Sequence, residues 1–244
     1  MEEKINQFLK LIKESENIVF FGGAGVSTES GIPDFRSKDG LYNQKYDYPP
    51  EEILSHTFFQ NNTKEFYKFY RDKMNSLKYE PNITHIKLSE LEKIGKLKAI
   101  ITQNIDGLHQ KAGSQNVLEL HGSVMRNHCI KCGKKYSGEY IFNETVGIPK
   151  CNEENCNGII KPDVVLYEEG LDDIIVEQSI VSIANADLLI VAGTSLTVYP
   201  AAGLINYYNG NKLVLINKDI TPMDKRANLV INTSLGKVFE KIEV

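Results

Sequence analysis

The segment IVFFGGAGVST, residues 18–28, places four consecutive apolar residues directly before a glycine-rich turn. A short, continuous apolar run is typical of a strand that is buried on both faces of a parallel sheet. The glycines let the backbone approach a phosphate group, and a helix that starts there offers unpaired N–H groups to it. Two interpretations stay open: a turn that binds a nucleotide, and a tight strand-to-helix turn without a ligand. The dinucleotide fingerprint of dehydrogenases is incomplete, because Thr28 stands where its third small residue would be.

Similar apolar runs recur along the chain, at residues 97–101, 188–191, 213–216 and 229–231. Helical spacing or helix-compatible composition is found at residues 5–12, 172–184 and 201–208. Strands and helices that alternate in this way form parallel sheets covered by helices on both faces. We therefore expect an α/β protein whose larger part is a doubly wound, Rossmann-like parallel sheet.

The composition is that of an ordinary globular protein, with 244 residues of which 41% are hydrophobic and 25% charged. No apolar run approaches the roughly 20 residues that a membrane-spanning helix needs, and Met1 is followed by acidic residues rather than by a secretory signal. We expect no membrane association and a cytoplasmic location. The formal net charge of -4 provides no basic field for phosphate backbones, so nucleic-acid binding is not expected.

The four cysteines form two pairs, Cys129-x2-Cys132 and Cys151-x4-Cys156. Disulfides rarely persist in a reducing compartment, and this spacing is close to that of zinc ribbons, whose short loops turn both sulfurs toward one ion. Four thiolates leave no open position for water, so we expect a structural zinc rather than a catalytic one. The alternative is four buried thiols without a ligand.

Two stretches interrupt the alternation of strands and helices. Residues 51–91 are rich in aromatic side chains at helical spacing, and residues 123–161 contain the cysteines and few periodic segments. We expect a smaller lobe made of a helical insertion and a zinc-ribbon insertion. The predicted division is a Rossmann-like domain at 1–36, 92–122 and 160–244, a helical insertion at 37–91 and a zinc-ribbon insertion at 123–159.

Polar residues stand at the ends of the predicted strands. Residues 102–107 follow the strand at 97–101, His121 follows a short apolar stretch, residues 193–195 end the strand at 188–191, and Asn217 ends the next. Ligands of open parallel sheets bind at the carboxyl ends of the strands, so we expect these residues to share one crevice.

Taken together, these motifs resemble the sirtuin family of bacterial type, NAD-dependent protein lysine deacylases. The resemblance is carried by GAGVSTESGIPDFRS at 23–37, TQNIDGLH at 102–109, the pair His121-Gly122, the paired cysteines, GTSL at 193–196 with Val198 and Pro200, and Ile216-Asn217. It runs from Phe20 to about Leu235. It implies that the Rossmann-like domain binds NAD as a co-substrate.

The resemblance also implies roles for individual residues. Ala24, Gly25 and Thr28 would contact the phosphates of NAD, and Phe35 and Arg36 would lie on a flap over it. Gln103 and Asn104 would hold the ribose, and Ile105 and Asp106 would line the nicotinamide pocket. Gly193, Thr194, Ser195 and Asn217 would bind the adenosine half. His121 would be the general base, with Asn104 as the second catalytic residue; a histidine suits proton transfer near neutral pH.

Substrate contacts are expected along the segment around Val164 and Tyr167, which resembles the family strand that pairs with a peptide. Here Tyr167-Glu168-Glu169 replaces the more usual phenylalanine, glycine and glutamate, and the added carboxylate would favour basic flanking residues. The partners would be acetylated lysine side chains of proteins or peptides, and the products nicotinamide, free lysine and O-acetyl-ADP-ribose.

The acyl preference is inferred from one comparison. Family members that remove succinyl groups carry a tyrosine followed three positions later by an arginine that pairs with the acyl carboxylate. In this chain Tyr70 follows Tyr67 at that spacing, and Arg71 comes one position late. We therefore expect a deacetylase that extends to longer apolar acyl groups and removes succinyl weakly. The alternatives are a mono-ADP-ribosyltransferase using the same NAD cleavage and a zinc-ribbon nucleic-acid module.

Overall fold

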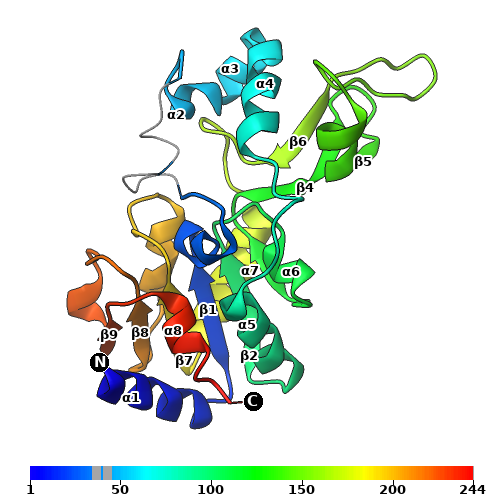
Figure 1. The fold of residues 1–244 in the computed structure, drawn as a ribbon. Coiled ribbons are helices and arrows are strands. Elements are labelled where there is room, and N and C mark those ends of the chain that lie inside the picture. The colour runs from blue at the N-terminus through cyan, green and yellow to red at the C-terminus, as the bar shows by residue number, and fades with distance from the viewer. Residues whose placement is uncertain (35–39, 41–45, 244) are drawn as a thin grey trace.

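The computed structural model describes residues 1–34, 40 and 46–243 of the chain. Its larger sheet has six strands, all parallel, in the order β3-β2-β1-β7-β8-β9 (Figure 1). The strands are β1 (Ile18–Gly22), β2 (Leu97–Thr102), β3 (Val117–Glu119), β7 (Leu188–Ala192), β8 (Leu213–Ile216) and β9 (Leu229–Ile231). Each predicted apolar run is therefore a strand, and the Rossmann-like sheet is confirmed.

Helices cover both faces of this sheet because its strands are apolar on both sides. In β1, Ile18 and Phe20 belong to one core, and Val19 and Phe21 belong to the other. The first core is closed by α1 (Glu2–Lys13), α5 (Ile83–Lys93) and α8 (Leu235–Phe239), and the second by α7 (Asp173–Asn185) and the 3₁₀ helix Ala201–Tyr207. The alternation along one strand thus accounts for the doubly wound arrangement.

The strand order reverses between β1 and β7, which lie side by side in the middle of the sheet. From β1 the chain adds β2 and β3 on one side, and from β7 it adds β8 and β9 on the other. In sheets of this kind the crevice at the carboxyl ends of the two central strands is the preferred ligand site. The glycine-rich turn after β1 and the turn after β7 both open there.

The smaller lobe combines both insertions around one core. It contains α2 (Pro50–Ile53), α3 (His56–Asn61), α4 (Thr63–Lys73) and an antiparallel sheet of order β5-β4-β6, formed by Lys135–Ser137, Gly122–Cys129 and Ile160–Val164. The aromatic side chains of α3 and α4, among them Phe58, Phe66 and Tyr70, share a buried cluster with Val124 and Ile160. Figure 1 shows α3 and α4 beside β4–β6, above the large sheet.

Two elements near the predicted domain boundaries pack against a different domain from the one to which they were assigned. β6 lies in the segment expected to belong to the Rossmann-like domain, but it pairs with β4 of the small sheet. α5 was expected in the helical insertion, but it packs against β2 and α8 and buries Leu88 and Leu91 in a core of the large sheet. The exact domain boundaries stay a prediction.

The remaining helices are short. They are α6 (Leu108–Lys111), the 3₁₀ helices Ala24–Val26, Thr28–Ser30 and Asp224–Arg226, and the π-helix Tyr140–Glu144. Within the described residues, no helix has the length and apolar character required to cross a bilayer.

Candidate active site and metal site

The two central turns of the large sheet touch each other through their backbones. Gly25 N–H donates to Gly193 O at 2.8 Å. A Cβ atom on Gly25 would lie 2.8 Å from Gly193 Cα, and one on Gly193, whose φ is +60°, would lie 2.5 Å from Val26 N. Only glycine fits at either position, because the two turns pack backbone against backbone. Both turns also line a cavity at the ends of β1 and β7, and we call this part of its lining the glycine cradle.

A cavity of about 540 Å³ extends from this cradle to the small lobe. Most of the predicted site residues line it: Ala24, Gly25, Gln103, Asn104, Ile105, Asp106, His121, Val164, Tyr167, Gly193, Thr194, Ser195 and Asn217. The structure therefore brings together residues from five strand ends and from the small lobe.

Three predicted residues are not placed in this cavity. Thr28 does not line it, and its hydroxyl donates instead to Gly25 O at 3.0 Å, within the glycine-rich turn. Phe35 and Arg36 lie outside the described residues. The roles expected for these three residues stay predictions.

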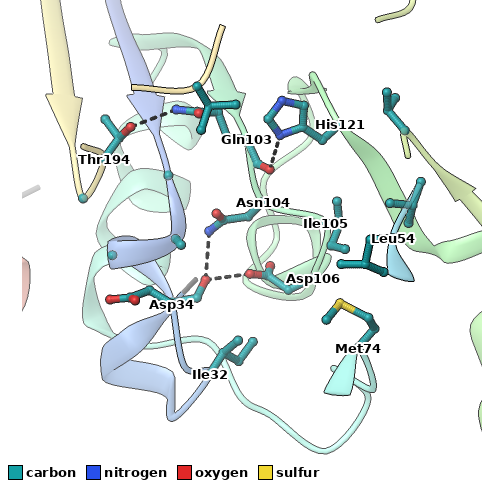
Figure 2. Close-up of a pocket in the computed structure, with 18 of the residues that line it drawn as sticks. Ile32, Asp34, Leu54, Met74, Gln103, Asn104, Ile105, Asp106, His121 and Thr194 are labelled. Atoms are coloured by element: carbon teal, nitrogen blue, oxygen red, sulfur yellow. Dashed lines mark hydrogen bonds between the residues drawn. The ribbon is translucent and has the colours of Figure 1, made fainter. Parts of the chain in front are cut away.

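Gln103 connects the two sides of the cavity. Its side-chain amide donates to Thr194 Oγ1 at 3.0 Å, and its backbone oxygen lies 2.8 Å from His121 Nδ1 (Figure 2). Its own N–H donates to Gly22 O at the end of β1. One residue thereby fixes the histidine relative to the turn after β7.

The contact with Gln103 determines which nitrogen of His121 can act as a base. A carbonyl oxygen only accepts hydrogen bonds, so Nδ1 carries the proton and Nε2 keeps its lone pair in the neutral ring. Burial lowers the pKa of His121 below its usual 6.5, against the opposing effect of the hydrogen bond to Gln103. The ring is therefore neutral near pH 7 and ready to accept a proton.

Ser27 links the glycine-rich turn to the loop after β2, a role not predicted from the sequence. Its hydroxyl donates to Asp106 Oδ2 at 2.7 Å and accepts from Asn104 Nδ2 at 3.1 Å. The Asn104 amide is oriented by this bond, which leaves its oxygen available to a ligand. Asp106 also accepts from Leu108 N–H at 2.9 Å, and burial raises the pKa of its carboxyl group.

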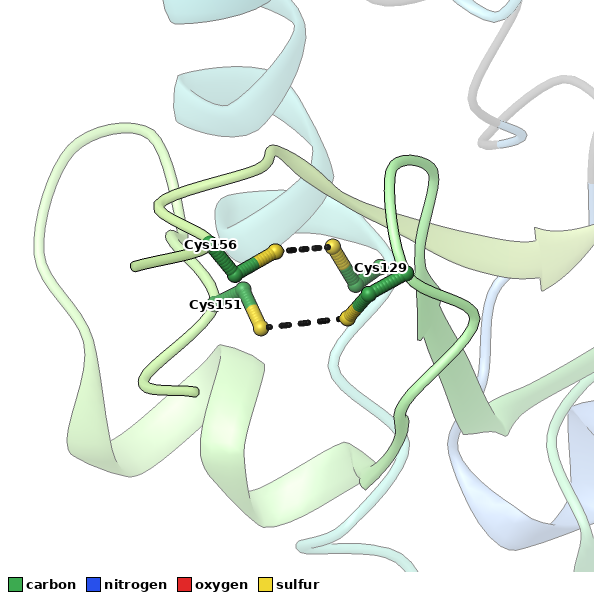
Figure 3. A group of neighbouring side chains, drawn as sticks. Cys129, Cys151 and Cys156 are labelled. Carbon is green, nitrogen blue, oxygen red and sulfur yellow. Dashed lines mark hydrogen bonds between the residues drawn. The ribbon is translucent and has the colours of Figure 1, made fainter. Parts of the chain in front are cut away.

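The four cysteines converge in the small lobe, as Figure 3 shows. Their sulfur atoms all lie within 4.8 Å of one another, with Cys129 Sγ 3.6 Å from Cys156 Sγ and Cys132 Sγ 3.6 Å from Cys151 Sγ. None is in a disulfide. Tetrahedral Zn–S bonds of about 2.3 Å require sulfurs about 3.8 Å apart, so the donor set and spacing fit a closed zinc site. The predicted metal ligands are therefore positioned for a structural zinc.

Comparison with known proteins decides the family. The Sir2 family model matches residues 23–200, which is most of the chain. The chain belongs to the Sir2 family. This confirms the resemblance carried by the sequence motifs, and the matched region includes the cradle, the histidine and the cysteines.

The matches to relatives and to solved structures cover nearly the whole of this Sir2 protein. It is 60% identical over 242 residues to a protein of Clostridium acetobutylicum named NAD-dependent protein deacetylase, with 98% of each chain covered. A protein of the same name from Clostridium perfringens is 58% identical, with 99% of each chain covered. A solved Sir2 with a p53 peptide and NAD+ is 40% identical, with a TM-score of 0.85 over 97% of this chain and 96% of that one. These names lend no support to the ADP-ribosyltransferase alternative.

The side of the Sir2 cavity opposite Thr194 is apolar. Leu54, Met74 and Ile105 gather there next to His121 and Asp106 (Figure 2), and Leu166 also lines it. Leu54 and Met74 come from the helical insertion, which the sequence did not connect to the site. A lysine side chain has four methylene groups, and a wall of this kind can bury them.

The segment after β6 forms the rim of this apolar side. Tyr167 N–H donates to Leu54 O, and His56 N–H donates to Tyr167 O, both at 3.0 Å. The segment is thereby tied to the end of α2 and the start of α3. In addition to its backbone bond, His56 contacts Glu169 and Gln60 through its side chain.

Tyr67 and Arg71 both point away from the cavity. The Tyr67 hydroxyl donates to Ile160 O, and Arg71 donates to the carbonyl oxygens of Ile141 and Gly147 and to Thr145 Oγ1. Neither residue lines the cavity, whereas the buried ring of Tyr70 does. The guanidinium of Arg71 is therefore committed to the zinc-ribbon insertion.

Proposed function

We propose that this protein is an NAD-dependent protein lysine deacetylase that releases nicotinamide and O-acetyl-ADP-ribose. The observation that carries the proposal is one cavity in which a glycine cradle, a neutral histidine and an apolar wall face the same space. Membership in the Sir2 family and relatives named NAD-dependent protein deacetylase support it.

NAD fits the polar side of the cavity. The two glycine-rich turns line this side of the cavity next to Ala24, and their backbone N–H groups suit a pyrophosphate. We assign the ribose beside nicotinamide to Gln103 and Asn104, nicotinamide to Ile105 and Asp106, and adenosine to Gly193, Thr194, Ser195 and Asn217. NAD supplies a ribose carbon that becomes electron-deficient as its bond to nicotinamide breaks.

The chain's own residues position the reactants and move a proton. The apolar wall of Leu54, Met74 and Ile105 holds the acetyl-lysine arm and excludes water from the reacting carbon. We propose that Val164 and Tyr167 belong to a segment along which the peptide backbone adds as a strand. Asn104, oriented by Ser27, fixes the ribose. His121 Nε2 accepts the proton of a ribose hydroxyl, as general base.

The test of this function is a product assay. The protein is incubated with NAD and an acetylated peptide, and nicotinamide, the deacetylated peptide and the sugar product are followed by mass. We expect equimolar nicotinamide and O-acetyl-ADP-ribose. Peptide that stays acetylated while ADP-ribose becomes attached to protein would overturn the proposal in favour of ADP-ribosyl transfer.

The acyl preference follows from the wall and from Arg71. The wall is apolar, and Arg71 is held by Ile141, Gly147 and Thr145, so no guanidinium of the described residues meets the acyl group there. We propose that acetyl and longer apolar acyl groups are accepted and succinyl poorly. With one peptide carrying acetyl, butyryl or succinyl, we expect kcat/KM for succinyl to be at least about tenfold below acetyl, the loss from burying one unpaired charge. Comparable turnover of acetyl and succinyl peptides would contradict this.

The pH dependence of the reaction tests the base. His121 must be neutral to accept a proton, and burial lowers its pKa, so the base form persists below pH 6.5. We expect the acid limb of kcat/KM to have its midpoint below 6.5, with activity lost only as the pH falls further. The measurement is kcat/KM for the acetyl peptide from pH 4.5 to 8 at saturating NAD. A midpoint above 6.5 would speak against a buried, desolvated base.

A further inference from the structure

Two adjacent carboxylates at the rim of the cavity have different surroundings. Glu169 is enclosed by its own chain: its Oε2 accepts from Leu166 N–H at 2.9 Å and from Lys161 Nζ at 3.0 Å, and its Oε1 lies 2.8 Å from His56 Nδ1. Both of its oxygens are therefore used to hold the segment after β6. Glu168 is exposed and also lines the cavity.

Glu168 is held at the rim by Thr57, whose side chain and backbone N–H both bond to its carboxylate; the N–H donates to Oε2 at 2.9 Å. Among the described residues, no lysine or arginine forms an ion pair with it. The hydrogen bonds from the side chain and the backbone N–H of Thr57 lower the pKa of Glu168, so the side chain is ionised throughout the neutral range. The carboxylate thus has a fixed place at the rim, where it is exposed and negatively charged.

Glu168 has a backbone conformation that is unusual for a residue with a side chain. Its φ is +75°, in the left-handed region that favours glycine and disfavours residues with a Cβ. A glycine would adopt this turn without strain. The chain instead carries a glutamate there, and such strained positions gather at sites of recognition.

Most of the charged side chains around the cavity are acidic. Of the described side chains that line it, Asp34, Asp106, Glu168, Glu169 and Asp219 are acidic. The basic one is Lys73, which pairs with Asp72 at 2.9 Å. The rim near Tyr167 therefore attracts cations and repels anions.

We propose that Glu168 is a specificity-determining residue that favours substrates with arginine or lysine beside the acetyl-lysine. This inference rests on the proposed deacetylase function and on peptide binding along the segment at 164–168. The guanidinium or ammonium of the flanking residue pairs with the exposed carboxylate of Glu168. Acidic flanking residues are disfavoured at the same place.

The test uses three acetyl-lysine peptides that differ only in the residues on both sides of the acetyl-lysine: arginine, glutamine or glutamate. At low salt we expect kcat/KM for the arginine peptide to exceed that for the glutamine peptide roughly two- to fivefold, the range of an exposed ion pair. The difference should lie in KM and should shrink in about 0.5 M NaCl, because exposed charges are screened.

Two variants assign the preference to Glu168. Glu168→Gln keeps an acceptor for Thr57 N–H and removes the charge, so the arginine-to-glutamine ratio should fall to about one. Glu168→Lys should invert the order, with the glutamate peptide preferred. The matched control is Glu177→Gln, which removes the same charge from an exposed position on α7 outside the cavity and should keep the wild-type ratio.

The outcomes separate the two proposals. If the wild-type protein deacetylates none of the peptides, the deacetylase function itself fails. If it deacetylates all three equally, or if the preference for arginine persists in both Glu168 variants, the role of Glu168 is refuted while the function stands. Loss of the preference in Glu177→Gln as well would also refute it, because net charge alone would then explain the effect.

Discussion

Replacing His121 by alanine is expected to lower kcat by about 10²- to 10⁴-fold, the usual contribution of a positioned general base. In the wild-type chain Gln103 O holds the protonated Nδ1, which leaves Nε2 as the free base of the proposed reaction. Alanine removes the base and leaves the cradle and the apolar wall in place. The measurement is steady-state deacetylation with saturating NAD and peptide, together with NAD binding by calorimetry, which should change little.

An asparagine at the same position separates proton transfer from orientation. His121→Asn can place an N–H group toward Gln103 O, but it offers no nitrogen that accepts a proton near neutral pH. We expect its kcat to be as low as that of the alanine variant. If asparagine restored turnover, His121 would act by ordering Gln103 rather than as a base.

Removing the metal is expected to unfold the small lobe and abolish deacetylation. Structural zinc sites bind with about 10–16 kcal/mol in isolated zinc fingers, which equals or exceeds the total stability of a typical domain. Without the ion, the four sulfurs, which lie within 4.8 Å of one another, are no longer held together by coordination to zinc. The measurements are zinc content per chain, hydrogen exchange over β4–β6 (122–164), and activity before and after chelation.

Two controls accompany the chelation experiment. Zinc added back after chelation should restore both exchange protection and activity, whereas Cys132→Ser, which removes one thiolate, should not be rescued to the same extent. The large sheet should keep its protection throughout, because its two cores contain none of the cysteines. Activity that survives complete removal of the metal would contradict the prediction.

The strands of the large sheet could be predicted because a strand buried on both faces must be apolar at every position. β1, β7 and β8 are uniformly buried, and each appears in the sequence as an unbroken apolar run. The cysteine spacing and the strand-end motifs are also local signals. The cysteine spacing predicted the metal ligands, and the strand-end motifs predicted most of the residues that line the cavity.

The parts that could not be predicted depend on contacts between distant residues. Ser27 acquires its role from Asn104 and Asp106, which are 77 and 79 positions away in the chain. α5 buries Thr84, His85 and Ser89 beside its leucines, so its composition did not indicate that it covers the large sheet. β6 is a short strand of alternating burial whose partner is known only from the fold.

The position of Arg71 relates the metal to substrate choice. Arg71 belongs to α4 and donates hydrogen bonds to Ile141 O and Gly147 O in the zinc-ribbon insertion. The same helix carries Tyr70 and ends beside Met74, both at the apolar wall. A molecule that has lost its ion should therefore lose its acyl-lysine wall, while the large sheet, to which we assign NAD, stays folded. In a partly demetallated preparation, the number of NAD molecules bound per chain would overstate the fraction of competent enzyme.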